Sequence, residues 1–424
     1  MTRILLQCFT RTHWKHPGQT VACLTASIRC RNYHSAKGVK AQDGAEVHIV
    51  DLRSDTMTKP TIAMRKAMAE AEVGDDVFGE DPTINALQKR VAKLFNMESG
   101  LYVPTGTMGN LISVLAHCQT RGLEVLLGDK SHIHLYEQGG IATLGGVHPR
   151  TVANLPDGTF DLDIIDDYIR PTDDPHQPWT QLVCVENTHN FCGGKAIPIS
   201  FMKRLREKAD EYGIGVHMDG ARMLNAAVAL GVEPAEIVQY ADSVSLCLSK
   251  GVGAPVGSVI CGKAEFIATA HRLRKAVGGG MRQAGVIAAA AMVALDDVTT
   301  RLARDHEHAQ MIAKVLQEHG AGVVDIDPAG VHSNIVMVDI IKDGLLAPDF
   351  CHRLNQVTPD ELDELKLPIQ VWCMPFSNTK VRLVTHSNMT REDIDLAVKK
   401  LRYTLGEMHV KITKSSKEPA YYTN

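Results

Sequence analysis

Alternating apolar and polar residues mark a series of short strands along the middle of the chain. Residues 243–250 read SVSLCLSK, in which every second side chain is apolar, the period-two pattern of a buried strand. Residues 214–219 (IGVHMD) repeat this pattern. Further short apolar runs occupy residues 101–103, 124–127 and 182–186.

Helical patterns separate these strands. In one of them, Asp81 and Pro82 open a segment whose apolar residues recur three and four positions apart, so we expect a capped helix with one buried face. Another helix is expected over residues 200–212, ending at Gly213. The alternation continues to Cys261 and predicts an α/β fold with a doubly wound, mostly parallel sheet.

The pattern changes at about Thr299. A long helical segment is followed by strands and by a last helix that begins at Thr390, with Asp393 placed for reciprocal capping. The strands are expected at 334–338, 370–373 and 380–385. At 424 residues the chain is too long for one ordinary domain. We therefore expect a large domain over 47–298, a small α+β domain over 299–406 and a tail over 407–424.

The first 42 residues differ from the rest because they carry basic residues and no acidic residue before Asp43. Apolar residues are interspersed among threonine and serine in the same stretch. This composition is typical of a mitochondrial transit peptide, and a disordered basic arm is the competing interpretation. We expect the mature protein in the mitochondrial matrix, with the cytoplasm as the alternative.

The remaining composition is that of an ordinary globular enzyme. Apolar residues make up 44% and charged residues 22% of the chain, and the formal net charge of −4 gives no reason to expect a nucleic-acid partner. The sequence has no apolar run of the roughly 18 residues that cross a bilayer. Its ten cysteines lie scattered without C-x-x-C pairs, which indicates reduced thiols.

Two strand ends carry the candidate chemistry. Lys250 ends the 243–250 strand and Asp219 ends the 214–219 strand, so both face the crevice where open α/β sheets bind ligands. A lysine that forms a Schiff base and an aspartate that faces a pyridine nitrogen are what pyridoxal phosphate requires. Taken alone, Lys250 also fits a strand-end lysine that reaches solvent.

A candidate phosphate seat lies at residues 104–110 (PTGTMGN), between a strand and a helix. Small residues there leave backbone N–H groups open at the positive end of the helix dipole. An ordinary strand-to-helix turn is the competing interpretation. The P-loop string is absent, and no metal site is predicted.

Nine strings in order together resemble the signature set of threonine aldolases. They are DLRSDT, GDDVFGEDPT, PTGTMGN, ENTHN, HMDGAR, LSKG, APVGS, GGGMRQAG and RLVTH, and they span about Val47 to Leu405. The resemblance is to the low-specificity, L-configured branch. It implies an aspartate-aminotransferase-like fold (fold type I), pyridoxal 5'-phosphate as cofactor and a homo-oligomer. The sequence departs from the family at His134, where relatives often carry an aromatic residue, and in a stretch near 358–367 that looks longer.

The resemblance also implies roles for individual residues. Lys250 would be the Schiff-base lysine, and Asp219 would pair with the pyridine nitrogen. His132 would stack on the ring, and His189 would lie by the substrate hydroxyl. The other implied roles concern binding. They are Gly106 and Thr107 for the phosphate, Arg222 for the cofactor, Ser54, Arg222 and Arg382 for the substrate carboxylate, and Lys275 and Arg282 as contributions from a neighbouring subunit.

The expected reaction is the cleavage of L-threonine or L-allo-threonine to glycine and acetaldehyde. His189 is the first candidate for the base that takes the hydroxyl proton, and His132 is the second. One alternative is another reaction of the same cofactor, either β-elimination or hydroxymethyl transfer. Another is a non-catalytic homologue. The sequence does not decide between threonine and allo-threonine, or between dimer and tetramer.

Overall fold

A seven-stranded sheet forms the centre of the larger part of the protein. The computed structural model describes residues 47–170 and 174–415. Strand β8 is antiparallel to both of its neighbours, and all other pairs are parallel, so the mostly parallel sheet predicted from the sequence is confirmed. The strands in spatial order are β2 (Ser99–Val103), β8 (Ser258–Gly262), β7 (Ser243–Cys247), β6 (Gly215–Asp219), β5 (Trp179–Glu186), β3 (Leu123–Gly128) and β4 (His148–Val152).

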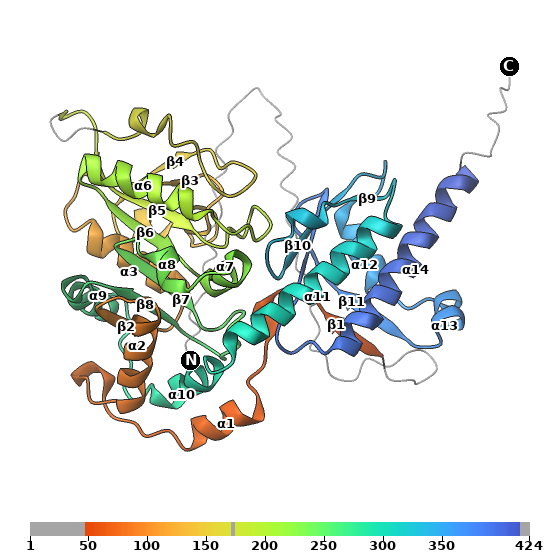
Figure 1. Ribbon diagram of the computed structural model, residues 1–424, viewed down its shortest axis with the longest axis horizontal. Helices are drawn as coiled ribbons and strands as arrows, with labels where there is room; N and C mark the ends of the chain where they lie inside the picture. Colours follow the sequence, from red (N-terminus) through yellow and green to blue (C-terminus); the bar gives the residue numbers. More distant parts are fainter. Residues whose placement is uncertain (1–46, 171–173, 416–424) are drawn as a thin grey trace, which may run out of the picture. The chain divides into compact units, whose positions relative to one another are not determined.

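Helices cover both faces of this sheet (Figure 1). One face packs against α2 (Pro82–Leu94), α6 (Ile199–Tyr212), α7 (Met223–Leu230), α8 (Pro234–Val238) and α10 (Gly285–Ala294). The other face packs against α3 (Gly106–His117), α5 (Gly140–Thr143) and α9 (Ala264–Ala276). Helix α1 (Ile62–Ala69) lies against α10, and the one-turn helix α4 (His132–Leu135) follows β3.

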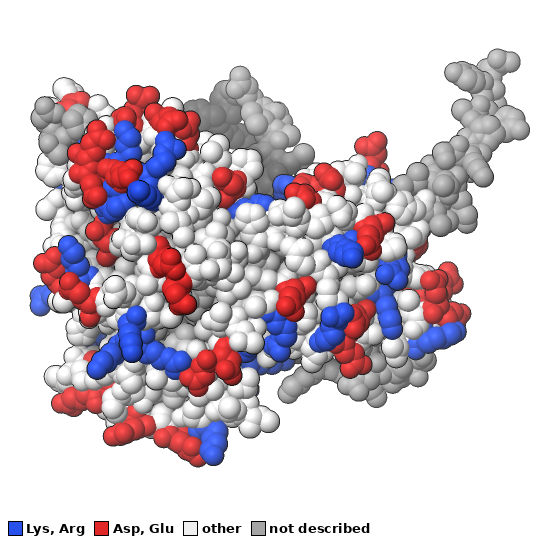
Figure 2. All heavy atoms as spheres, in the orientation of Figure 1, with Lys and Arg blue, Asp and Glu red and all other residues white. Residues whose placement is uncertain are grey.

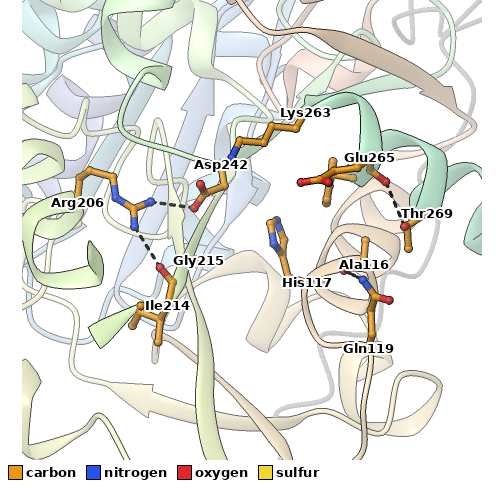
Figure 3. Close-up of a pocket in the computed structure, with 12 residues that line it drawn as sticks. Ala116, His117, Gln119, Arg206, Ile214, Gly215, Asp242, Lys263, Glu265 and Thr269 are labelled. Carbon is orange, nitrogen blue, oxygen red and sulfur yellow. Dashed lines mark hydrogen bonds and ion pairs between the residues drawn. The ribbon is translucent and has the colours of Figure 1, made fainter. Parts of the chain in front are cut away.

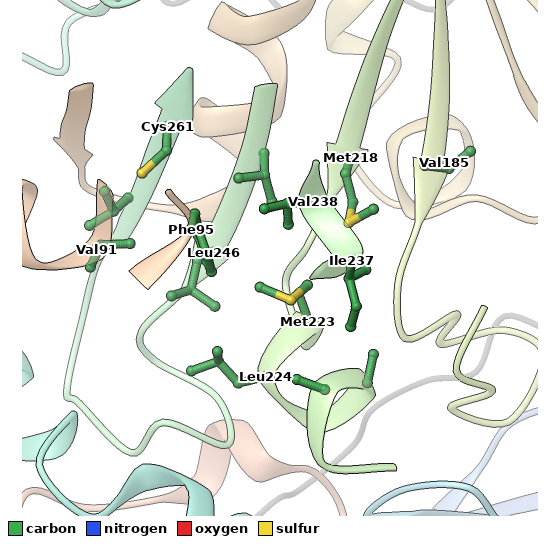
Figure 4. Packing of buried hydrophobic residues seen from close by; sticks show 14 of the residues in the cluster. Val91, Phe95, Val185, Met218, Met223, Leu224, Ile237, Val238, Leu246 and Cys261 are labelled. Atoms are coloured by element: carbon green, nitrogen blue, oxygen red, sulfur yellow. The ribbon is translucent and has the colours of Figure 1, made fainter. Parts of the chain in front are cut away.

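Alternation along the strands explains this layering. Met218 of β6 and Leu246 of β7 point to the same side and pack with Met223 and Ile237 (Figure 4). The polar residues between them, such as His217 and Ser243, are buried toward the opposite helix layer. The predicted cap of α2 is also present, because Asp81 accepts a hydrogen bond from the Ile84 N–H.

The C-terminal part has its own core. Helix α11 (Val298–His319) leads into an antiparallel sheet of β12 (Met374–Pro375), β13 (Lys380–Val384), β10 (Ile335–Ile340) and β9 (Val324–Asp325). Apolar residues of α11, of this sheet and of two of three further helices form a second buried cluster, and partly buried Leu365 of the third helix packs against it. These helices are α12 (Ala347–Leu354), α13 (Pro359–Leu365) and α14 (Arg391–Ser415).

Two features differ from the domain boundaries expected from the sequence. Strand β1 (His48–Asp51) pairs in parallel with β11 (Ile369–Trp372), so the first strand, placed in the large domain, lies with the C-terminal part. Helix α14 continues to Ser415, so residues 407–415 are helical where a tail was expected. The leader over 1–42 and the end of the tail lie outside the described residues, and the division at 298/299 stays a prediction.

Charged side chains of both signs are interspersed on the face seen in Figure 2. Within the described ranges, no helix is both long and apolar enough to span a bilayer.

Candidate active site

The ends of β6 and β7 meet at one edge of the sheet. The two strands are parallel neighbours, with Asp219 opposite Ser245, and the chain reaches Lys250 shortly after β7 ends. Asp219 is buried, whereas the Lys250 side chain is partly exposed. The structure therefore brings these two residues to the same edge, as their strand ends predicted. In the described part of the chain, the Lys250 ammonium has no hydrogen-bond or ion-pair partner.

Asp219 accepts hydrogen bonds on both carboxylate oxygens. Oδ2 accepts from the Asn110 side-chain amide at 3.0 Å, and Oδ1 accepts from the Ala221 N–H at 3.1 Å. Two donors aimed at two oxygens fix the orientation of the carboxylate. A buried carboxylate held in this way can face a cationic or protonated group of a ligand.

His132 lies close to Asp219 through a shared acidic neighbour. Its Nδ1 donates to Glu137 Oε1 at 2.9 Å, and the same oxygen accepts from the Asn110 amide at 2.8 Å. Burial acts to lower the pKa of His132, but the hydrogen bond to Glu137 and the charge of Asp219 outweigh it, so the pKa is raised. The His132 backbone N–H is held by Glu186 at 2.6 Å.

By distance alone, one atom each from His132, Glu137 and Asp219 could ligate a metal, since these atoms lie within 4.8 Å of one another. The Asn110 amide argues against a cation there, because its two N–H bonds point at the two carboxylates. Donor hydrogens beside the acids favour an anionic cluster that is already satisfied.

Helix α3 begins at the predicted phosphate seat. Thr105 caps it, its side chain accepting from the Met108 N–H at 3.1 Å. A Cβ on Gly106 would lie 2.5 Å from the Cys247 sulfur at the end of β7, so only glycine fits between helix and sheet. The first N–H groups of a helix, here those of Gly106 and Thr107, have no intrahelical acceptor and can bind an anion.

Arg222 forms a buried bidentate ion pair with Asp55. The two nitrogen–oxygen distances are 2.8 and 2.7 Å. Burial acts to raise the pKa of Asp55, but the Arg222 guanidinium and, to a lesser extent, Lys250 hold it well below its usual range. Arg222 therefore already has a counter-ion, and only its Nη1 is left to face Asn190, at 3.4 Å.

Arg382 is a buried cation without a carboxylate partner among the described residues. Its Nη1 donates to Asn190 at 2.8 Å, Nη2 makes only long contacts with Arg53 and Met374, and Nε is buried without a described partner. Burial and the nearby Arg222 lower the pKa of Arg382 to about 10, so it still carries its charge near neutral pH. A buried guanidinium with free donors is a site for an anion.

Ser54 and His189 are buried. Their contacts do not test the roles that the resemblance implies, which are carboxylate binding for Ser54 and a place by the substrate hydroxyl for His189. The Ser54 hydroxyl accepts from the Thr56 N–H at 3.2 Å. His189 Nδ1 accepts from the Cys192 N–H at 3.4 Å, and its Nε2 is buried without a described partner. His189 lies against Gly158, where a Cβ would be 2.6 Å from the His189 Cβ.

The residues expected to reach a neighbouring subunit lie apart from these clusters. The Lys275 side chain is exposed, and Arg282 is more than half exposed while it pairs with Asp75 at 2.8 Å. Sequence reasoning missed Arg274, which is fully buried, pairs with Asp76 at 2.7 Å and donates to the Tyr102 carbonyl. Arg274 lies on the buried face of α9, whereas the next residue, Lys275, is exposed, and no other feature of the sequence distinguishes the two.

Comparison with known proteins shows the family to which the chain belongs. The model of the β-eliminating lyase family matches residues 51–342. Low-specificity L-threonine aldolase 1 of Arabidopsis thaliana is 45% identical over 346 residues, which cover 81% of this chain and 93% of the relative. The low specificity L-threonine aldolase of Escherichia coli K12 is 41% identical over 346 residues, 82% of this chain and 96% of the relative.

The chain belongs to the threonine aldolase family. Family members are lyases, and the family is generally dependent on pyridoxal phosphate. The fold is shared as well, since the solved Leishmania major threonine aldolase superposes with a TM-score of 0.66 at 18% identity, covering 84% of this chain and 99% of that one.

The residues present fit the cofactor of this family. A buried carboxylate that accepts on both oxygens, a helix start kept open by Gly106 and an unpartnered lysine match the three ends of pyridoxal phosphate: ring nitrogen, phosphate and aldehyde. Sequence reasoning missed Asn110, Glu137 and Asp55, although Asn110 and Asp55 lie within the quoted strings PTGTMGN and DLRSDT. Their polar type inside those strings was the available signal.

Proposed function

We propose that this protein cleaves L-threonine and L-allo-threonine to glycine and acetaldehyde with pyridoxal phosphate as cofactor. The observation that carries the proposal is that Asp219 and Lys250 meet at one edge of the sheet, at the ends of neighbouring parallel strands. The charge of Lys250 acts on Asp55, which pairs with Arg222, and also on His132, which belongs to the cluster around Asp219. One amine is therefore within electrostatic reach of an anion site and of a buried carboxylate. The names of the relatives supply the substrate class.

Bound pyridoxal phosphate supplies an electron sink for a bond broken at the substrate's α-carbon. Lys250 is the amine that holds its aldehyde, Asp219 is the partner of its ring nitrogen, and the start of α3 is the seat of its phosphate. The His132 ring is held by its Nδ1 hydrogen bond to Glu137, which fixes its orientation.

The arginines orient the substrate. Arg382 has free donors and no described counter-ion, so it receives the substrate carboxylate, with Arg222 Nη1 beside it. Fixing the carboxylate sets which bond of the α-carbon faces the electron sink, and this choice separates carbon–carbon cleavage from other reactions. His189, or next His132, takes the proton of the β-hydroxyl group.

The decisive experiment compares the four stereoisomers of threonine. Purified protein with added pyridoxal phosphate should release acetaldehyde and glycine in equal amounts from L-threonine and L-allo-threonine and not from their D forms. Release of ammonia and a keto acid instead would identify β-elimination, and one-carbon transfer from L-serine would identify hydroxymethyl transfer. Binding of the cofactor without any turnover would leave only a non-catalytic homologue.

Lys250→Ala tests the central residue. Removing the amine should abolish the visible absorption band of the bound cofactor and slow turnover by several orders of magnitude. Lys263→Ala, which changes a lysine in the pocket lined by His117, is the matched control and should keep both. Near-normal turnover of Lys250→Ala would remove Lys250 from the mechanism.

We also propose that the protein is a homo-oligomer of the mitochondrial matrix. The exposed side chains of Lys275 and Arg282 support the first part, because the family resemblance places them in a neighbour's site. Light scattering of the purified protein measures the assembly, and a monomeric mass with full activity would contradict a shared site. The basic leader supports the second part.

A further inference from the structure

A row of hydrogen bonds runs from Asp219 through the sheet to its other end. The Asn110 side-chain amide donates to Asp219, and its Oδ1 lies 3.2 Å from His217 Nε2. His217 Nδ1 contacts the Ser243 hydroxyl at 2.8 Å, and the same hydroxyl contacts His117 Nε2 at 2.8 Å. His217 and Ser243 are fully buried. The row joins α3, β6 and β7. Asp219 ends β6, and Lys250 follows the end of β7.

The direction of every hydrogen bond in the row follows from one fixed end. Both Asn110 N–H bonds point at the carboxylates of Glu137 and Asp219, so the Asn110 oxygen must accept, and His217 Nε2 must donate to it. With neutral rings, His217 Nδ1 then accepts from the Ser243 hydroxyl. The Ser243 oxygen in turn accepts from His117 Nε2–H.

Neutral rings agree with the surroundings. Burial lowers the pKa of His217 to about 3 and that of His117 to about 4, so both rings are uncharged near neutral pH. Exchanging donor and acceptor in any one of these hydrogen bonds forces the same exchange in the next one. The Asn110 oxygen would then face the Asp219 carboxylate, which is repulsive. An amide does not relay a proton as a hydroxyl or imidazole does, so the row transmits orientation and not protons.

The far end of the row opens into a pocket of about 500 Å³ (Figure 3). His117 lines this pocket, where Arg206 pairs with Asp242 at 2.8 Å. The remaining His117 nitrogen, Nδ1, lies beside Gly215 of the lining, 3.4 Å from where a Cβ would be. Water in this polar pocket can donate to Nδ1 without reversing the row.

We propose that His117, Ser243 and His217 are positioning residues that hold the Asn110 amide in one orientation, so that it always donates to Asp219, the partner of the cofactor's ring nitrogen. The role toward the cofactor rests on the proposed function, whereas the single orientation of the row belongs to the protein alone. Each member acts through the next, and Asn110 is the residue that touches Asp219.

Ser243→Ala is the first test, with Ser245→Ala as its matched control. The two serines lie on the same strand and face, both are buried, and the Ser245 hydroxyl has no partner among the described residues. Ser243→Ala should lower kcat and kcat/KM about tenfold, the equivalent of one hydrogen bond of about 1.4 kcal/mol, with KM and thermal unfolding like those of the control. Equal kinetics in both variants would overturn the positioning role.

His217 supplies a rescue experiment. His217→Phe keeps the ring shape but removes the donor to Asn110, whereas a glutamine amide can place a donor close to Nε2. His217→Gln should therefore recover most of the kcat lost in His217→Phe and restore the pH range over which the visible band of the bound cofactor is constant. If both variants lose activity and band alike, His217 is only a packing residue.

A third measurement needs neither substrate nor cofactor. Nitrogen-15 spectra of histidine-labelled apoprotein should show His117 and His217 as neutral Nε2–H tautomers, and Ser243→Ala should shift the His217 signals while Ser245→Ala does not. A protonated ring or an Nδ1–H tautomer at His217 would refute the row itself. Correct tautomers in a protein that cleaves no threonine would refute only the proposed function.

Discussion

At the scale of single residues, two hydrogen-bond donors hold the Asp219 carboxylate in place. One oxygen accepts from an amide side chain and the other from a backbone N–H, so an asparagine at this position satisfies only one of the two donors. Asparagine keeps the size of aspartate, so the substitution tests the charge of Asp219 together with its second acceptor oxygen.

Asp219→Asn should keep cofactor binding while it weakens stabilisation of the charge that develops in the transition state. We expect kcat and kcat/KM to fall together by roughly 10²-fold, about 2.7 kcal/mol of barrier, with little change in KM. Steady-state kinetics and a cofactor titration provide the measurement. An asparagine variant with wild-type kcat and weaker cofactor binding would make Asp219 an anchor only.

Part of the site was predictable because strand ends can be read from the sequence. Asp219, Lys250 and Gly106 follow recognisable strands, and parallel strands bring such ends together. Asn110, Glu137 and His217 were not predictable as partners, since each hydrogen bond joins different elements and no spacing links them. The Asp55–Arg222 pair was missed for the same reason.

At the scale of elements, helix α11 carries a carboxyl group in an unfavourable place. Asp305 is fully buried, and neither of its carboxylate oxygens has a hydrogen-bond partner in the described part of the chain. Burial raises the pKa of Asp305 from 3.8 to about 7. Between these two values the unfolded chain releases a proton that the folded protein keeps, so stability falls as pH rises through this window and is level above it.

Asp305→Asn removes this dependence. The melting temperature of the variant should gain on that of the wild type as pH rises from about 5 to about 7.5. Glu307→Gln, an exposed acid in the same helix, serves as the control and should show a pH-independent difference. A constant difference for Asp305→Asn as well would mean that the buried carboxyl is ionised throughout.

Helix α13 lies in the stretch near 358–367 that looks longer than in relatives. A cluster of buried ion pairs connects it to α12 and α14. Lys400 of α14 is fully buried and pairs with Glu361 of α13, while Arg353 of α12 reaches the same glutamate at 3.0 Å. Burial lowers the pKa of Lys400 to about 8.

Lys400→Met should destabilise the protein by about 3–5 kcal/mol because it leaves a buried carboxylate with one partner fewer. The double variant Lys400→Met/Glu361→Leu should recover much of this loss, since no charge is then stranded. Denaturant unfolding measures both. A double variant as unstable as the single one would show that packing, and not charge, fastens α13.

Most elements were predictable from the sequence, with two instructive exceptions. Periodicity located the strands of the central sheet and the helices between them, because each has one buried face. Residues 48–51 were placed in the large domain without a predicted strand, because four residues carry no information about a partner near the other end of the chain. Helix α14 was cut short because polar residues continue a helix as readily as they form a tail.

At the scale of the whole molecule, the proposed location in the mitochondrial matrix rests on the basic leader. Residues 1–42 fused to a fluorescent reporter should direct it to mitochondria and be removed there. A version with its seven cations changed to glutamine should stay in the cytosol; these are Arg3, Arg11, Lys15, Arg29, Arg31, Lys37 and Lys40. A diffuse signal from the unchanged fusion would favour the disordered basic arm.

The pairing of β1 with β11 has a consequence for the order in which a newly made chain gains function. Ser54 and Asp55 lie three and four residues after the end of β1, and His48 pairs with Ile369, so the strand that leads to them gains its partner only after most of the chain has been synthesised. Translation proceeds from the N-terminus at roughly 5–20 residues per second. The central sheet can therefore form on the ribosome before β1 has its partner, and a chain that stalls before residue 369 holds Asp219 and Lys250 but lacks both β11 and Arg382.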